Sequence, residues 1–175
     1  NDNNMIAAGS VAGAMDDDFC SDAFLSLYKV DFTDMASPQM PVVAKCAIPD
    51  RVHKVDWSTH HGNSGIVAGG LVDGSVCIWS ADTLLKNGPT PDADAEDPLL
   101  CRIQQHTAAV KGCQFNPLQP NFLATGGADK ELLIWNLENV TQPKSVPACP
   151  KTTQAGEITD VRWNPKFSHI LGTTM

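Results

Sequence analysis

The sequence is poor in basic residues, with 12 Lys and Arg against 20 Asp and Glu and a formal net charge of −8. A nucleic-acid-binding domain needs a basic surface that neutralises phosphates, so this balance argues against that class. It argues equally against a polybasic anchor on an anionic membrane surface. No run of about 18 apolar residues is present, so the sequence predicts no membrane-spanning helix.

Motifs that carry catalysis or hold metals are also missing. The sequence has no G-x-S-x-G, P-loop, G-x-G-x-x-G or H-E-x-x-H pattern, so we predict no catalytic residues, no metal site and no cofactor. The six cysteines lack C-x-x-C and zinc-finger spacing. A chain of 175 residues without a secretory signal does not need disulfides, so free cytosolic thiols are expected. These cysteines are Cys20, Cys46, Cys77, Cys101, Cys113 and Cys149.

Two polar clusters resemble metal sites only superficially. His60 and His61 are adjacent, so on an extended chain they point in opposite directions, and we interpret them as part of a solvated loop. Asp16, Asp17 and Asp18 with Asp22 lack the residue order of a calcium-binding EF-hand, and we interpret them as a charged turn.

The start of the chain is polar and acidic and has none of the features of a signal peptide. It also lacks an initiator Met. We therefore expect the chain to be an internal piece of a longer protein.

What the sequence does contain is an internal repeat. Three segments, 52–57, 110–115 and 158–163, alternate apolar and polar residues and end in Trp57, Phe115 or Trp163. Alternation with a period of two is the signature of a β-strand. Two of the segments continue as Asn-Pro, a turn dipeptide that ends a strand.

A second repeated unit follows the first. Residues 67–79 align with residues 123–135 at a constant offset of 56, and each copy predicts a strand, a tight Gly-Asp turn and a strand that ends in Trp. Residues 7–13 and 25–28 fit the same unit, with Tyr28 in the Trp position. Residues 169–173 fit its first strand. No useful helical period appears, so the sequence predicts an all-β chain.

Strand units with Gly-Asp turns and terminal Trp residues indicate a β-propeller of the WD-repeat type. A β-sandwich is the alternative, but the constant offset favours the propeller. The chain would hold about three blades and the start of another. We predict blade one at 1–45, blade two at 46–85, an acidic Pro-rich insert at 86–98 as a loop between repeats, blade three at 99–140, a loop at 141–153, and the start of blade four at 154–175.

The third blade carries the residues of a buried polar relay. Asp129 is expected to accept from one imidazole nitrogen of His106, the other nitrogen to meet the Thr125 hydroxyl, and that hydroxyl to meet the indole of Trp135. Catalysis by His106 is the alternative that this arrangement disfavours. The second blade keeps only Asp73 and Trp79, so we expect it to be held mainly by apolar packing.

The first blade resembles that of a known family. Residues 7–19, followed by 25–30, resemble the unusual first blade of the large outer subunit of the COPII vesicle coat, the Sec thirty-one family. Residues 115–127 look like that family's third blade, and 163–171 resemble its fourth. Two departures are Asn136 in place of the usual Asp and the insert at 86–98.

This resemblance implies a cytoplasmic, non-catalytic scaffold on COPII vesicles and on the cytoplasmic face of the endoplasmic reticulum. It would support vesicle formation and ER-to-Golgi transport at the coat vertices. It implies as partners a second WD-repeat coat protein, the Sec thirteen family, and other coat subunits, with inner-coat contacts outside this chain. No family motif assigns an interface residue here. No nucleic acid or small-molecule substrate is expected, and membrane association would be indirect.

Two other functions remain open on the same fold. One is a peptide-binding adaptor of another cytosolic complex, although Arg51, Arg102 and Arg162 fall at different repeat positions and form no cluster in the sequence. The other is an enzyme propeller, which the same scatter disfavours. Because propellers close with about 4–8 blades, we expect this chain alone to aggregate or to be completed by another segment.

Overall fold

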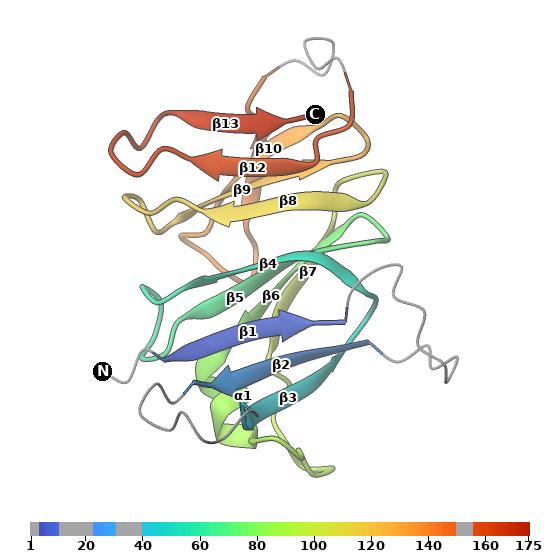
Figure 1. Cartoon of the computed structure of the whole chain (residues 1–175), viewed down its shortest axis with the longest axis vertical. Coiled ribbons are helices and arrows are strands. Elements are labelled where there is room, and N and C mark those ends of the chain that lie inside the picture. Colours follow the sequence, from blue (N-terminus) through green and yellow to red (C-terminus); the bar gives the residue numbers. More distant parts are fainter. Residues whose placement is uncertain (1–3, 11–22, 31–39, 150–155) are drawn as a thin grey trace.

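The computed structural model describes residues 4–10, 23–30, 40–149 and 156–175. These residues form four antiparallel sheets of three, four, four and two strands (Figure 1). The first sheet contains β1 (Met5–Gly9), β2 (Ala23–Lys29) and β3 (Val42–Ile48). The second contains β4 (Val52–Ser58), β5 (Ile66–Leu71), β6 (Ser75–Ser80) and β7 (Leu99–Gln104). The third contains β8 (Val110–Phe115), β9 (Phe122–Gly127), β10 (Leu132–Asn136) and β11 (Lys144–Pro147), and the last contains β12 (Asp160–Trp163) and β13 (Leu171–Thr174).

Each sheet is a meander in which strands that follow in sequence pair with one another. In Figure 1, β12, β8, β4 and β1 follow one another along the long axis of the molecule, and contacts between neighbouring sheets join these strands. Successive sheets therefore pack face to face, as the blades of a propeller do. The prediction of an all-β, partial propeller is confirmed.

The core is divided into three layers, one between each pair of neighbouring sheets. The middle strands contribute most, since all six residues of β5 are buried. The continuous apolar run of β5 reflects burial on both faces. The first strands of the later sheets, β4, β8 and β12, are called the inner strands, and their alternation reflects one apolar face and one polar face.

Three glycines mark equivalent contacts between sheets. A Cβ atom built on Gly9 would lie 2.4 Å from Cγ2 of Val52, one on Gly70 would lie 2.6 Å from Cγ1 of Val110, and one on Gly126 would lie 2.5 Å from Cγ2 of Ile158. Each glycine thus makes room for the first apolar residue of the following sheet's inner segment. The match identifies β1 as the counterpart of β5 and β9. Among the described residues, the first sheet therefore has no counterpart of the inner strands β4, β8 and β12.

A short helix, α1 (Ala81–Asn87), interrupts the strands and was not predicted. Ser80 caps its first turn by accepting from the N–H of Thr83, and Gly88 follows its last turn with φ of 78°. Seven residues are too few to show a helical apolar period, but Ser80, Asp82, Lys86 and Gly88 are ordinary helix-end signals. No described helix has the length and apolar character to cross a membrane.

The sheets divide the chain at other points than the predicted blades. Strand β3 spans the predicted boundary at 45 and pairs with β2, and β7 pairs with β6 of the second sheet rather than with residues 110–115. The insert at 86–98 therefore precedes β7 of the second sheet and does not lie between two sheets. The predicted blade at 99–140 begins with β7, the outer strand of the second sheet. The boundaries of the sequence repeat therefore differ by one strand from those of the sheets.

Strand β11 falls inside the segment predicted as a loop at 141–153. Most of its residues are exposed, and it contains Pro147. Such a strand pairs on one side only and carries no apolar alternation, which is why its sequence reads as a loop.

Candidate functional site

The structure brings the four predicted relay residues of the third sheet together. His106 lies in the loop before β8, Thr125 on β9, Asp129 in the turn after β9, and Trp135 on β10. The His106 ring contacts both carboxylate oxygens of Asp129 through Nδ1 at 3.1 Å and the Thr125 hydroxyl through Nε2 at 2.9 Å. The indole N–H of Trp135 donates to the same hydroxyl at 2.8 Å. All four residues are buried.

These contacts have one consistent direction of donation for a neutral imidazole. Trp135 donates to Thr125, the Thr125 hydroxyl donates to Nε2 of His106, and Nδ1–H of His106 donates to Asp129. The carboxylate also accepts the N–H groups of Thr107 and Glu131. Burial by itself would raise the pKa of Asp129, but these main-chain donors and His106 outweigh it and lower the pKa below its usual value. The relay therefore ties a loop and a turn to two strands.

The same place is the one described cluster with the composition of a metal site. His106, Asp129 and Glu131 offer ligand-type atoms within 4.8 Å of one another. Both ring nitrogens of His106 already contact Asp129 and Thr125. A metal on either nitrogen would displace one of these contacts, so the geometry serves the relay instead.

The second sheet ties its turn in a different way. Asp73 accepts from the N–H and hydroxyl of Ser75 at 2.8 and 2.6 Å, and it forms an ion pair with Arg102 on the outer strand β7. These partners outweigh the effect of burial and lower the pKa of Asp73. Sequence reasoning missed Arg102 because its strand was assigned to the next blade.

Trp79, the other residue predicted for this sheet, is 1% exposed. A Cβ atom built on Gly69, the counterpart of Thr125, would lie 2.8 Å from Cζ3 of the Trp79 ring. The ring therefore occupies space that a threonine would need. The second sheet has an indole packed on main chain where the third sheet has a hydroxyl relay.

Of the two polar clusters singled out in the sequence, only the pair His60 and His61 lies within the described residues. His61 contacts the carbonyl oxygen of Pro120 through Nε2 at 3.2 Å, which joins a loop of the second sheet to one of the third. His60 is exposed and His61 is half-buried, so the pair lies in a largely exposed loop that contacts the third sheet through His61. Asp16, Asp17, Asp18 and Asp22 lie outside the residues that the structure describes.

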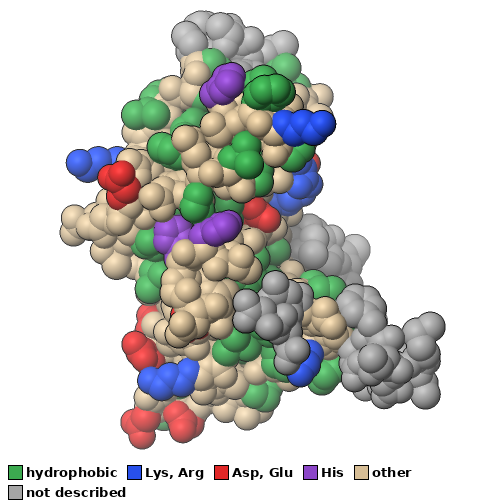
Figure 2. Space-filling view, turned by 90° about the vertical axis from the view of Figure 1, so that its left-hand side faces the viewer, with side chains coloured by type: hydrophobic (Ala, Val, Ile, Leu, Met, Phe, Trp, Pro, Cys, Tyr) green, Lys and Arg blue, Asp and Glu red, His purple; other side chains and the backbone are tan. Residues whose placement is uncertain are grey.

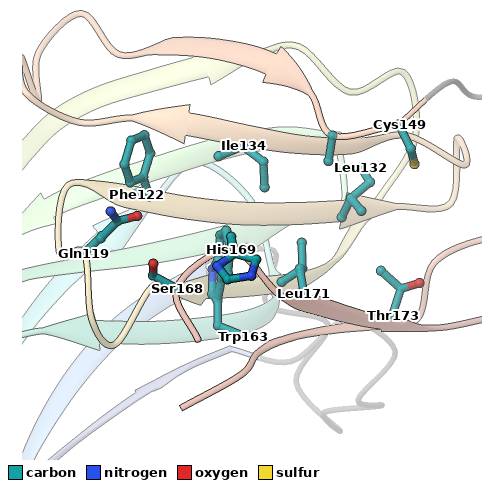
Figure 3. Close-up of a pocket in the computed structure, with 11 residues that line it drawn as sticks. Gln119, Phe122, Leu132, Ile134, Cys149, Trp163, Ser168, His169, Leu171 and Thr173 are labelled. Atoms are coloured by element: carbon teal, nitrogen blue, oxygen red, sulfur yellow. The ribbon is translucent and has the colours of Figure 1, made fainter. Parts of the chain in front are cut away.

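An open groove of about 580 Å³ lies between the third and last sheets. Phe122, Leu132 and Ile134 line one side, with Leu171 and Thr173 of β13 across from them (Figure 3). The residues equivalent to Leu132 and Ile134 in the second sheet are Val76 and Ile78, and both are fully buried against the third sheet. The groove is thus a continuation of the surface on which sheets pack.

Side-chain character differs between the two ends of the molecule. Figure 2 shows hydrophobic side chains over the upper part of this face, with basic, acidic and His side chains among them, while several acidic side chains and a basic one gather at its lower end. Near α1, Lys86 pairs with Glu96 of the insert at 3.2 Å, with both side chains largely exposed. Exposed ion pairs of this kind contribute little to stability.

Comparison with known proteins agrees with this geometry. The sequence model of the family described as "WD domain, G-beta repeat" matches residues 98–136. Among solved structures, a chain of "COPII on membranes, outer coat vertex" superposes with a TM-score of 0.73 at 24% identity, covering 97% of this chain and 41% of that one. A chain of the mitotic checkpoint complex gives 0.53 at 19% identity, covering 87% and 40%. At these identities the structural matches show the fold alone.

Curated relatives carry more information. Protein transport protein SEC31 of Dictyostelium discoideum is 34% identical over 172 residues, which are 96% of this chain and 13% of that protein. Protein transport protein SEC31 of Coccidioides immitis (strain RS) is 37% identical over 170 residues, again 96% and 13%. The chain thus spans about one eighth of these relatives. Since the similarity runs through nearly all of its sheets, the chain belongs to the SEC31 family of protein transport proteins.

Proposed function

We propose that this chain is part of a structural scaffold of the COPII outer coat, which supports vesicle formation and ER-to-Golgi transport through protein–protein contacts at coat vertices. The observation that carries the proposal is the 34–37% identity to SEC31 proteins over 96% of the chain. The fold shared with a chain from an outer coat vertex supports it.

The chemistry of the described residues fits a scaffold. Its best-formed polar cluster, the relay of His106, Thr125, Asp129 and Trp135, is buried and internally bonded, so it holds the fold and does not face a substrate. Its open groove is lined mainly by apolar side chains that continue an inter-sheet surface. We therefore propose a non-catalytic role in which exposed sheet faces and loops make the contacts.

The finer parts of the proposal concern partners and place. A second WD-repeat coat protein of the Sec thirteen family and other coat subunits are the proposed partners. The proposed location is the cytoplasmic surface of the endoplasmic reticulum and COPII vesicles, with the membrane reached only through the coat. The strong acidic balance of the chain, −8, favours protein partners over direct binding to anionic lipid.

Coat reconstitution on liposomes tests the proposal. Full-length protein is compared with a version that lacks the segment corresponding to this chain, and cage vertices are counted by electron microscopy. Loss of closed vertices, with the shortened protein still soluble and still bound to its WD-repeat partner, is the expected result. Vertices that form in equal number without the segment would overturn the proposal. Recovery of the full-length protein in an unrelated cytosolic complex, with no coat subunit, would favour an adaptor.

A further inference from the structure

The residue before the terminal aromatic contacts the next sheet in two equivalent inner strands. Asp56 on β4 accepts the main-chain N–H of Phe115 on β8, with 2.7 Å between Oδ2 and N. Gln114 on β8 accepts the main-chain N–H of Trp163 on β12, with 2.6 Å between Oε1 and N. Each bond therefore joins the inner strand of one sheet to the inner strand of the next.

These two N–H groups have no ladder partner within their own sheets. The N–H of Asn116 donates to Phe122 on β9, and the N–H of Asn164 donates to Ile170 before β13. Because successive N–H groups of a strand point to opposite sides, those of Phe115 and Trp163 point to the open inner edge. An edge N–H that is not paired must find water or a side-chain acceptor.

We propose that Asp56 and Gln114 are inter-sheet clasps, positioning residues that capture the edge N–H of the following sheet and thereby fix its distance and angle. The hydrogen bond requires a side chain with an acceptor oxygen at the position of Asp56 and Gln114. Its direction is the same at both junctions, since each side chain positions the inner strand of the sheet that follows. A scaffold built from such sheets gains a fixed angle between consecutive sheets that apolar packing alone specifies less sharply.

Further contacts at the same edge support the proposal. The indole N–H of Trp163 donates to the carbonyl of Gln114 at 3.1 Å, so Gln114 holds that residue through both main chain and side chain. Lys54 on β4 pairs with Asp160 on β12 at 3.4 Å. Gly112 on β8 stands at the repeat position that Lys54 has on β4. It allows β12 to approach β8, since a Cβ atom on Gly112 would lie 2.8 Å from the N atom of Val161.

The equivalent position in β12 differs in chemistry. Arg162 occupies it, and a guanidinium has donors but no acceptor. Its Nε donates to Asp160 at 3.0 Å. The series of clasps among the described residues therefore consists of Asp56 and Gln114.

Hydrogen–deuterium exchange of the full-length protein, resolved to single amides, tests the proposal. Asp56→Ala is expected to speed exchange at the Phe115 amide on the order of tenfold, the effect of losing one hydrogen bond, and to leave the Trp163 amide unchanged. Asp56→Asn keeps an acceptor oxygen and should restore protection. Gln114→Leu should expose the Trp163 amide and spare that of Phe115, and Gln114→Glu should restore it.

The reciprocal pattern separates a clasp from general stabilisation. The proposal is overturned if Asp56→Ala leaves exchange at Phe115 unchanged, if both amides respond alike to either variant, or if the acceptor-preserving variants fail to restore protection. If either Asp56→Ala or Gln114→Leu does not fold, the other of these two variants, compared with its acceptor-preserving counterpart, still supports or contradicts the proposal.

Discussion

Gly70 on β5 lies so close to the next sheet that a Cβ atom built on it would stand 2.6 Å from Cγ1 of Val110 and 2.8 Å from the carbonyl oxygen of the same residue. The oxygen belongs to the main chain and cannot rotate away. We expect Gly70→Ala to lower the free energy of unfolding by about 1–3 kcal/mol, the usual cost of overpacking a core. Denaturant unfolding measures the change.

Gly156→Ala is the matched control for this prediction. A Cβ atom there would lie 3.9 Å from its nearest neighbour, the Cβ atom of Met175, which is ordinary contact. This variant should unfold like the parent protein. Equal stability of Gly70→Ala and the parent would show that the second and third sheets can separate without cost.

Among the residues that the structure describes, the Thr125 hydroxyl is the hydrogen-bond acceptor of the buried Trp135 indole, so its removal leaves a buried donor unpaired. Thr125→Val replaces the hydroxyl with a methyl group and leaves the indole N–H without its acceptor. We expect a loss of about 1–3 kcal/mol, the cost of an unsatisfied buried donor. Thermal unfolding of Thr125→Val beside Thr125→Ser, which keeps the hydroxyl, measures it. If the valine variant were as stable as the parent protein, the hydroxyl would contribute nothing to stability and the prediction would be wrong; any loss in the serine variant measures the methyl group alone.

How far the sequence predicts this structure depends on what each residue contacts. The relay residues were identifiable because His106, Thr125, Asp129 and Trp135 stand at fixed repeat positions with complementary donors and acceptors. The structure places them within hydrogen-bonding distance. The all-β partial propeller followed from the repeat in the same way.

Features without a repeated counterpart were not predictable. The ion pair of Asp73 with Arg102 joins residues that the repeat assigns to different blades. Strand β11 has one partner and mostly exposed residues, so nothing in its sequence alternates. The clasps could not be predicted because Asp56 and Gln114 share only an acceptor oxygen. Their partners are main-chain N–H groups, and a sequence does not show which of these groups lack a partner in their own sheet.

Burial should make the Cys77 thiol unreactive in the folded protein. Its side chain lies in the core between the first and second sheets, is 0% exposed, and its pKa is raised to about 12, chiefly by burial. Because the thiolate is the nucleophile, alkylation at pH 8 should be at least about tenfold slower in the native protein than in urea. Mass spectrometry of the Cys77 peptide follows the reaction. Equal rates in both conditions would mean that the core opens on the time scale of the experiment.

Acid should weaken the third sheet through Asp129. The pKa of Asp129 is lowered in the folded state, so its ionised form contributes stability that is fully present above the unfolded pKa, about 3.9, and is lost as the pH falls through the folded value. Asp129→Asn should therefore reduce stability at pH 7 and also flatten the fall in unfolding free energy below about pH 4. Denaturant unfolding between pH 7 and pH 2.5 measures both effects. Asp94→Asn removes an exposed carboxylate instead and should keep the parent's pH dependence. An unchanged acid slope in Asp129→Asn would show that other carboxylates set the acid sensitivity.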